Sequence, residues 1–499
     1  MTSHAFSAIN QGLSVIKVEV EIKTIFGKPS FIIIGLANRV VAESRERITA
    51  SLLHCGVRLR ARKTIVNLAP ADLSKTTSSM ELAIAVALLQ IYEETHLDTR
   101  HSLFLGELSL DGQLRRVNGL LPIILQAKQM GIKRIFFPQA NLAELVAMPD
   151  LEFFPLESLG ELIAFGRGSK KLLPYKVTKP NFAKLTAGDS LDLADIFGQE
   201  QAKRALAISA AGGHNLLLFG PPGAGKSMLA QAILSILPPM SEEEFLEVNR
   251  LYSLAGLLER GLLTKRPFRA PHHSISSAAL IGGAKQNVGE IVLAHRGILF
   301  MDEFAEFSRS TLEILRQPLE QGQISIQRVE QRHTYPCDFT LVAAANPCAC
   351  GFAGSRKVCH CSLHQLQTYR SKFSGPLLDR IDLSLRIQEV QLRQIATSSH
   401  SESQAIKAQV GAAVARQRKR YLGTQFLRNS RLSSRAVLEF CQLTAKAKQV
   451  AQAAALRHQL STRAYFKLIK VAQTIADLQE SDEIQQEHVV EAFSLRESF

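Results

Sequence analysis

The chain has 499 residues, a length that favours about three domains over one hydrophobic core. It contains no apolar run near the roughly 20 residues of a membrane span, and its N-terminal segment lacks the features of a secretory signal, so we expect a cytoplasmic protein. Its net charge of +14 favours a polyanionic partner, most commonly nucleic acid.

Residues 1–168 have the pattern of an α+β domain. Residues 14–35 alternate in polarity and then become continuously apolar, which predicts two strands joined by a turn at Gly27-Lys28-Pro29. The same patterns predict a strand after residue 56 and at Leu103–Leu105, and helices at Val40–His54, Met80–Gln90 and Leu120–Met130.

Charged residues of this domain add two local expectations. Glu43 and Arg47 have the spacing of an exposed ion pair on a helix. The alternation of a strand would place Arg58, Arg60 and Arg62 on one face.

Composition divides the rest of the chain. Residues 169–190 are rich in lysine, proline and small polar residues without a sustained period, which is typical of a linker. In residues 191–394 helical patterns alternate with short β-rich runs, which predicts an α/β domain with a parallel sheet covered by helices. Residues 395–499 are helical in pattern and predict a C-terminal helical domain.

A glycine-rich loop follows the apolar run at residue 216 and precedes a helical pattern. The segment "GPPGAGKS" matches the G-x-x-x-x-G-K-[ST] phosphate-binding pattern in full. Its backbone N–H groups would point at the phosphates of ATP, Lys226 would neutralise the β- and γ-phosphate charge, and Ser227 would ligate Mg²⁺. The predicted nucleotide-binding residues are Gly220, Pro221, Pro222, Gly223, Ala224, Gly225, Lys226 and Ser227.

Two further apolar runs end in polar residues suited to ATP hydrolysis. In "GILFMDEF", Asp302 would hold the Mg²⁺ shell and Glu303 would polarise the attacking water. In "FTLVAAANP", the Asn346 amide would hold the same water or the γ-phosphate. Each has a plainer reading, because an acidic pair also begins helices and an asparagine before Pro347 also forms turns.

These motifs, together with "SGPLLDRIDL" and "LSTRAYFKLIKVAQTIADL", resemble the magnesium-chelatase-like branch of AAA+ ATPases. More closely, the chain resembles the ComM/YifB family nearly end to end, in phrases such as "IIIGLANRVVAESRERI", "GELSLDGQLRRVNGLLP" and "FRAPHHSISSAALIGG". The resemblance implies a P-loop AAA+ domain with a C-terminal helical lid, preceded by a domain similar to the Lon-protease/ribosomal-S5 fold.

The resemblance also implies roles for two arginines. Arg380 in "LLDRID" matches an arginine finger that reaches a neighbouring subunit's γ-phosphate, which requires a ring, in this family a hexamer. Arg463 in "LSTRAYF" matches a sensor arginine that touches nucleotide in its own subunit. The alternative is that each is a surface arginine in a salt bridge.

The Lon-like resemblance raises the alternative of an ATP-dependent protease with a Ser–Lys pair. Ser79 would occupy the serine position, but Leu121 stands where the lysine should be. Leucine cannot act as a base, so we expect a scaffold or binding surface without peptidase activity.

Two basic segments are candidates for a DNA-binding channel. "LLTKRPFRAPHHSISSAAL" carries Lys265, and "QISIQRVEQRHTYP" has the pattern of a hairpin that turns near Val329-Glu330 and also carries His333. The alternative is that their basic residues tie the segments to the ring, and the histidines are equally compatible with packing, turns or metal. A third basic run, residues 416–435 of the helical domain, is a further candidate or an ordinary solvated face. The candidate DNA contacts are Arg266, Arg269, His272, His273, Arg328 and Arg332.

Four of the seven cysteines crowd into "NPCACGFAGSRKVCHC". Four thiolates would bind a structural Zn²⁺, although paired C-x-C spacing is tighter than the usual C-x-x-C and His360 and His364 are rival ligands. Reduced free thiols and redox chemistry remain alternatives. The candidate zinc ligands are Cys348, Cys350, Cys359 and Cys361.

Together these features predict a ring-forming, Mg²⁺-dependent ATPase that moves on single-stranded or branched DNA. In the ComM/YifB family this implies promotion of branch migration during natural transformation. The alternatives are a protein-remodelling scaffold or a motor for metal insertion into a porphyrin. The segments "IGGAKQNVGEI" and "DLSKTTSSMEL" depart from the family pattern, which affects the channel insertion and the surface of the first domain.

Overall fold

The computed structural model describes residues 2–34, 38–58, 62–70, 78–177, 191–283, 288–327, 332–355, 357–373, 375–389 and 400–496. Its contacts divide the chain into two compact units. Unit 1 comprises Met1–Ala183 and Phe245–Leu263, and unit 2 comprises Lys184–Glu244 and Thr264–Phe499. No helix in the described part of the chain is both long and apolar enough to cross a membrane.

Unit 1 is built on a four-stranded sheet with the order β1-β2-β4-β3. Burial alternates along the strands, as in β4, so one face packs on a core that includes the almost wholly buried helix α2. A second, three-stranded parallel sheet has the order β5-β8-β9. The strands are β1 (Thr2–Gln11), β2 (Ser14–Ile25), β3 (Ser30–Ile34), β4 (Lys63–Ala69), β5 (Ser102–Phe104), β6 (Glu107–Leu108), β7 (Leu114–Arg115), β8 (Arg134–Pro138) and β9 (Glu152–Leu156).

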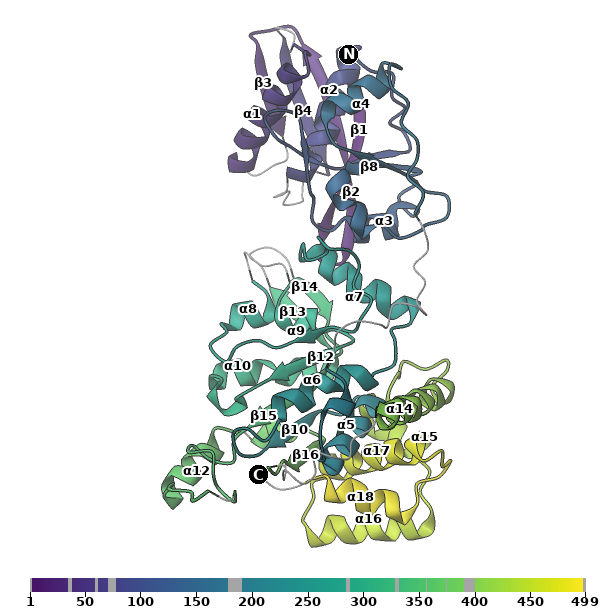
Figure 1. Ribbon diagram of the computed structural model, residues 1–499. Coiled ribbons are helices and arrows are strands. Elements are labelled where there is room, and N and C mark those ends of the chain that lie inside the picture. The colour runs from purple at the N-terminus through teal and green to yellow at the C-terminus, as the bar shows by residue number, and fades with distance from the viewer. Residues whose placement is uncertain are drawn as a thin grey trace. The chain divides into compact units, whose positions relative to one another are not determined.

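The helices of unit 1 are α1 (Asn38–His54), α2 (Glu81–Ile91), α3 (Leu120–Ala127) and α4 (Leu159–Gly166), together with most of α7 (Glu242–Leu254) (Figure 1). The sequence assigns all of 191–394 to the ATPase core, whereas the contacts place Phe245–Leu263 in unit 1. Within unit 1, Ser253 of this segment donates a hydrogen bond to the buried Glu144. A chain segment that returns to an earlier unit leaves no mark in local composition, so the pattern could not reveal it.

The predicted helices and strands of unit 1 are present, with three differences. The two strands predicted from residues 14–35 do not pair with each other, because β4 lies between them, antiparallel to β2 and parallel to β3. The strand β4 begins only at Lys63, so Arg58 and Arg62 do not share a strand face, and Arg60 lies outside the described residues. Arg47 lies 3.9 Å from Glu43 but only 2.6 Å from the buried Glu81, which is its main partner.

Unit 2 contains a five-stranded parallel sheet with the order β11-β12-β15-β10-β16. The strands β10, β12 and β15 are fully buried, which explains their continuous apolar sequences. The strands are β10 (Leu216–Phe219), β11 (Phe268–Arg269), β12 (Ile298–Met301), β15 (Thr340–Ala345) and β16 (Leu383–Arg386), with a separate hairpin of β13 (Gln323–Gln327) and β14 (Arg332–Pro336). The hairpin was predicted; its turn, with Arg328, lies outside the described residues.

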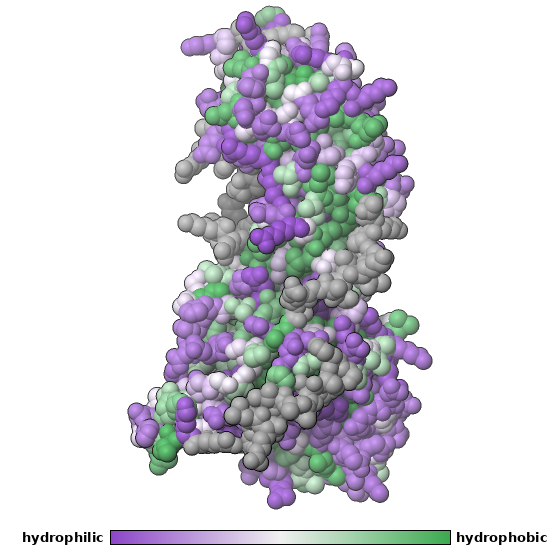
Figure 2. Space-filling model, in the orientation of Figure 1, coloured by the Kyte–Doolittle hydropathy of each residue, from purple (hydrophilic) through white to green (hydrophobic). Residues whose placement is uncertain are grey.

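Helices cover the sheet and form the C-terminal part of the chain (Figure 1). The lid helices α14 to α18 share one hydrophobic core with the sheet and with α5 and α6, so the lid belongs to the same compact unit as the ATPase core. The face over these C-terminal helices in Figure 2 is mostly hydrophilic. The helices are α5 (Glu200–Gly212), α6 (Lys226–Ile236), α8 (Ser277–Ile281), α9 (Glu290–Leu293), α10 (Arg309–Ile314), α11 (Arg316–Gln321), α12 (Leu363–Ser371), α13 (Gly375–Leu378), α14 (His400–Arg420), α15 (Ser434–Phe440), α16 (Ala445–Arg457), α17 (Thr462–Leu478) and α18 (Gln486–Ser494).

Candidate nucleotide site and its surroundings

The predicted phosphate loop joins the end of β10 to the start of α6. Gly223 and Gly225 have φ angles of 79° and 84°, in the left-handed region that glycine adopts without strain. A Cβ atom on Gly220 would lie 2.3 Å from the carbonyl oxygen of Ile387, so this position also has room only for glycine. The loop therefore exposes successive backbone N–H groups at a helix N-terminus, which is the geometry that binds phosphate.

Lys226 is buried and held by the loop itself. Its Nζ donates to the carbonyl oxygens of Gly220 at 2.7 Å and Pro221 at 2.9 Å, and to Oδ1 of Asn346 at 3.2 Å. Burial lowers the pKa of Lys226, while the charge of Asp302 opposes this shift. The ammonium group therefore lies within the phosphate loop, bound to the loop carbonyls and to Asn346.

The predicted Mg²⁺ ligands lie together. The Ser227 hydroxyl donates to Oδ2 of Asp302 at 2.7 Å, and the other carboxylate oxygen of Asp302 accepts from the backbone N–H of Glu303 at 2.9 Å. A hydroxyl and a carboxylate in contact at the carboxyl edge of a parallel sheet are oxygen ligands of the kind that Mg²⁺ takes alongside phosphates.

Glu303 has a partner that the sequence did not reveal. Its carboxylate lies 3.2 Å from Nδ1 of His273, whose ring lies tilted against that of His272, with the ring centroids 4.1 Å apart. The backbone of Glu303 has φ of 49°. A strained residue at the end of a β-strand beside a phosphate loop is typical of an active site. Because His273 belongs to a segment 30 residues earlier in the chain, only the fold brings the two side chains together.

Asn346 directly follows β15 and contacts both Lys226 and α12. Its side chain accepts from Lys226, and its backbone carbonyl accepts from the hydroxyl of Tyr369 on α12 at 2.9 Å. The predicted residues Lys226, Ser227, Asp302, Glu303 and Asn346 therefore lie at one edge of the sheet. Ligands of open α/β sheets bind at this edge, beyond the carboxyl ends of the strands.

Arg380 and Arg463 lie at the opposite edge. Arg380 and Asp382 come just before β16, and Asn215 comes just before β10; the Asn215 side chain donates to the Arg380 carbonyl at 2.9 Å. Since a four-residue strand is about 13 Å long, its length separates Arg380 from the phosphate loop of the same chain.

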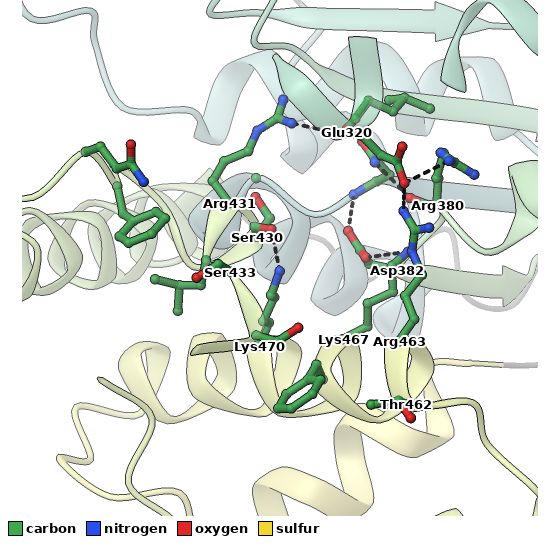
Figure 3. A pocket seen from close by; sticks show the side chains of 18 residues that line it. Glu320, Arg380, Asp382, Ser430, Arg431, Ser433, Thr462, Arg463, Lys467 and Lys470 are labelled. Carbon is green, nitrogen blue, oxygen red and sulfur yellow. Dashed lines mark hydrogen bonds and ion pairs between the residues drawn. The ribbon is translucent and has the colours of Figure 1, made fainter. Parts of the chain in front are cut away.

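Both arginines contact one carboxylate. Nη2 of Arg380 lies 2.8 Å from Oε1 of Glu320, and Arg463 pairs with the same oxygen, as Figure 3 shows. Burial raises the pKa of Glu320, but the hydrogen bonds from Arg380 and Arg463 outweigh it and lower the pKa. The family resemblance implies that Arg463 touches nucleotide in its own subunit, whereas in the structure it pairs with Glu320 beside Arg380.

A cavity of about 550 Å³ surrounds this cluster between the sheet edge and the lid helices (Figure 3). It is predominantly basic, and Lys467 pairs with Asp382 at 3.0 Å. Burial raises the pKa of Asp382, but the charges of Lys467 and His214 lower it well below its usual range. The charged lining residues are Glu320, Arg380, Asp382, Arg431, Arg463, Lys467 and Lys470.

The structure corrects part of the predicted DNA surface. Arg266 is only 7% exposed and pairs with Glu244 at 2.7 Å, while Arg269 forms two hydrogen bonds to Glu290 at 2.6 and 2.7 Å. These two arginines therefore fit the alternative given above, that the basic residues hold the segment in place, because their guanidinium groups pair with carboxylates of the same unit. Arg332 is exposed on β14, and His272 is exposed with Nδ1 2.8 Å from the Ser274 hydroxyl.

The basic run of the lid is also partly used within unit 2. Arg420 pairs with the buried Asp477, and Arg431 donates from Nε to Asp338 at 2.7 Å. Arg435 and Lys419 are exposed. The basic run therefore contains arginines that pair with carboxylates inside unit 2 and basic residues that are exposed to solvent.

In unit 1, Leu121 is fully buried on α3 and offers no basic group to a serine. The buried acid of this region, Glu81, instead accepts hydrogen bonds from Ser44 and Arg47 and from the backbone of Leu108. Burial raises the pKa of Glu81, and these hydrogen bonds oppose the shift.

The four clustered cysteines converge after β15. The sulfur-to-sulfur distances are 3.4 Å for Cys348–Cys350, 3.7 Å for Cys348–Cys359 and 3.5 Å for Cys350–Cys359, and all four sulfurs lie within 4.8 Å of one another. His360 and His364 are described but do not belong to this group.

A buried parallel sheet, a phosphate loop at its carboxyl edge and a helical lid on the same core define a P-loop domain of the AAA+ class, as the sequence predicts. Family models agree: residues 192–395 match "Magnesium chelatase, subunit ChlI", residues 18–141 match "Subunit ChlI of Mg-chelatase", and residues 400–496 match "Magnesium chelatase, subunit ChlI C-terminal".

Similar proteins extend the match to the whole chain. The competence protein ComM of Haemophilus influenzae is 38% identical over 98% of this chain and 96% of that protein, and the uncharacterized protein YifB of Salmonella typhimurium is 40% identical over 99% and 96%. The magnesium-chelatase 38 kDa subunit of Cereibacter sphaeroides is 28% identical over 30% of this chain and 51% of that subunit. The chain belongs to the ComM/YifB family of magnesium-chelatase-like proteins.

Proposed function

We propose that the chain is a Mg²⁺-dependent ATPase that works as a ring, with each active site completed by the neighbouring copy. The observation that carries this proposal is the separation of the catalytic groups. The phosphate-binding and acidic residues lie at the carboxyl edge of the sheet, and Arg380 and Arg463 lie at the amino edge. A head-to-tail ring brings the amino edge of one copy against the carboxyl edge of the next.

The carboxyl edge supplies binding and activation of water. The loop from Gly220 to Ser227 cradles the phosphates, and Lys226 moves its ammonium group from loop carbonyls to phosphate oxygens. Ser227 and Asp302 would hold Mg²⁺, which neutralises charge on the β- and γ-phosphates. Glu303 orients the attacking water, and Asn346 holds the γ-phosphate or this water.

The amino edge supplies positive charge to the partner's site. Arg380 stabilises the negative charge of the transferring phosphoryl group, and Arg463, beside it, serves the same neighbouring nucleotide. In the separated chain Glu320 holds both guanidinium groups. A γ-phosphate entering the cavity competes with Glu320 for them, so nucleotide binding and subunit contact are coupled.

We further propose that the ring is a hexamer and that its polyanionic partner is single-stranded or branched DNA. The net charge of +14, the exposed Arg332 of the β13–β14 hairpin and the similarity to a protein named for competence support DNA over other polyanions. The motor would then promote branch migration when incoming single strands are integrated during natural transformation. Contacts to the phosphate backbone would track the strand without reading its sequence.

The test is the ATPase rate with and without single-stranded and forked DNA at two salt concentrations. A motor on DNA is stimulated by DNA, and the stimulation weakens with salt because phosphate contacts release counterions. The Glu303→Gln variant, imaged by negative stain with ATP, should accumulate closed rings. Stimulation by a protein partner and not by DNA would instead favour a protein-remodelling scaffold, and stimulation by a porphyrin-binding subunit would favour metal insertion.

A further inference from the structure

The four clustered cysteines have the spacing of a tetrahedral metal site. Zn²⁺ bound by four thiolates at about 2.3 Å places neighbouring sulfurs about 3.8 Å apart, the edge of the tetrahedron. The observed separations of 3.4, 3.5 and 3.7 Å lie close to this edge. A disulfide requires a sulfur-to-sulfur distance near 2.05 Å, so none of these pairs is bonded.

The backbone around the cluster supports the same reading. The N–H of Ala353 donates to the sulfur of Cys348 at 3.3 Å, and the N–H of Gly351 donates to the Cys348 carbonyl at 3.0 Å, which closes a tight turn around the first C-x-C pair. Hydrogen bonds to a ligand sulfur fix its orientation and stabilise the thiolate form that binds metal. Four sulfur ligands with no carboxylate or imidazole in the group select zinc over magnesium, calcium or manganese.

We propose that Cys348, Cys350, Cys359 and Cys361 bind one Zn²⁺, and that this ion braces the nucleotide site. The second part rests on the proposed ATPase function. Binding would tie the two ends of the loop together and would release protons from the thiols that remain protonated.

The first end of the loop is attached to the nucleotide site. Cys348 is fully buried two residues after Asn346, whose side chain accepts from Lys226. Gly351 follows the first C-x-C pair, and a Cβ atom there would lie 2.9 Å from the Pro222 ring. The cysteine loop is therefore in direct contact with the phosphate loop.

The second C-x-C pair is connected to Asn346 through α12. This helix begins at Leu363, capped by Ser362 directly after Cys361, and carries Tyr369, whose hydroxyl donates to the Asn346 carbonyl. A metal ion bound by both C-x-C pairs would therefore link two segments that each contact Asn346: the cysteine loop that follows it and α12, which carries Tyr369. Loss of the ion frees both ends, because the described loop contains no regular helix or strand of its own between the pairs.

A third attachment reaches the sheet. Nη2 of Arg386, the last residue of β16, donates to the Ala353 carbonyl at 3.0 Å. Arg386 pairs in register with Phe219, the last residue before the phosphate loop. The loop therefore spans the carboxyl ends of β15, β10 and β16.

The metal is tested first, by its content in full-length protein purified under reducing conditions. We expect about one zinc per chain by mass spectrometry of the metals, and after exchange with Co²⁺ the visible absorption of tetrahedral thiolate ligation. Cys350→Ser and Cys359→Ser should lose the zinc, whereas Cys55→Ser, a partly buried cysteine of unit 1, should keep it. Metal-free wild type that also fails to bind added Zn²⁺, or Cys359→Ser with an unchanged zinc content, would overturn the site.

The bracing role is tested by affinity for a fluorescent ATP analogue. Chelation of zinc from wild type should raise the Kd about tenfold while the circular-dichroism spectrum is retained. Tyr369→Phe should keep its zinc and its thermal stability but raise the Kd about threefold, since it removes the hydrogen bond to Asn346 and leaves the ring in place. An unchanged Kd in the zinc-free protein would refute bracing and leave the zinc site standing. Absence of nucleotide binding in zinc-loaded wild type would instead contradict the proposed ATPase.

Discussion

The two edges of the sheet in unit 2 differ in how their polar groups are arranged. At the carboxyl edge Lys226 donates to the carbonyl oxygens of the phosphate loop, and Ser227 donates to Asp302. At the amino edge Arg380 and Arg463 are both held by Glu320.

This difference is the basis for our proposal that one chain contains halves of two different sites. Arg380 and Arg463 lie at the opposite end of the strands from the phosphate loop of the same chain, and Glu320 pairs with both of them. A site divided in this way makes hydrolysis depend on assembly. The following predictions, from the largest effect to the smallest, test whether the two edges really act on different nucleotides.

The largest effect should come from Lys226→Ala. The variant loses the ammonium group that neutralises the β- and γ-phosphates, so we expect ATP turnover to fall by at least about 10³-fold together with affinity for the nucleotide. Turnover is measured by phosphate release. Lys265→Ala, which removes an exposed lysine of the same unit, should retain basal turnover without DNA. Turnover by Lys226→Ala at the wild-type rate would contradict the assignment of the nucleotide site to this loop.

Arg380→Ala should separate turnover from binding. We expect turnover to fall about 10³-fold, as for other arginine fingers, while the Kd for nucleotide changes less than about threefold. Mixing Arg380→Ala chains with Lys226→Ala chains should restore part of the activity, because an intact loop then meets an intact arginine across some interfaces. Arg457→Ala, at an exposed position on α16, is the control. Full activity of a monomeric Arg380→Ala chain would contradict a divided site.

His273→Gln should reduce kcat about fivefold, the effect of losing one hydrogen bond of about 1 kcal/mol to Glu303. The Michaelis constant for ATP should change little, since His273 contacts no residue of the phosphate loop among its described partners. His272→Gln is the matched control, because His272 contacts Ser274 and the His273 ring, and no contact with Glu303 is found among its described partners. Equal effects of the two substitutions would count against a role at Glu303.

A substitution of Asp338 should show, through the free energy of unfolding, how strongly the sheet and the lid helices of unit 2 are coupled. Its carboxylate lies 2.9 Å from Arg296 of the core and pairs with Arg431 of the lid. Burial raises its pKa, but Arg431, Arg428 and Arg296 outweigh this and hold it at about 2. Because this folded-state pKa is below the ordinary value, the contribution is present above about pH 4 and is lost as the pH falls toward 2.

We therefore expect Asp338→Asn to lower the free energy of unfolding of unit 2 by about 2–3 kcal/mol at pH 7. The difference from wild type should shrink as the pH falls from about 4 to 2. Urea unfolding at several pH values measures both quantities. A difference that is independent of pH would show that the carboxylate charge does not link the lid to the core.

The nucleotide site was predictable because its residues follow strands in fixed local patterns. The phosphate loop, Asp302 and Asn346 each come directly after an apolar run, and carboxyl ends of parallel strands meet at one edge. The contacts of His273 with Glu303, of Glu320 with Arg380 and of Tyr369 with Asn346 were not predicted, since each pair is separated by 23 or more residues. Arg266 and Arg269 were assigned to DNA from their charge and their place in a segment that resembles a channel insertion. Neither property reveals that Glu244 and Glu290 lie beside them in the folded chain.

The sequence by itself determined the class of the molecule, the parallel sheet, the lid helices and the position of the phosphate-loop motif and acidic pair after their strands, because these features are written in local patterns of residues. Only the tertiary structure decided the side of the sheet on which Arg463 lies, the partner of Glu303, the assignment of residues 245–263 to unit 1 and the convergence of the four cysteines on the phosphate loop. The physical reason is that a side chain's partner depends on which distant segments the hydrophobic core brings together, and a local sequence pattern does not indicate which segments these are.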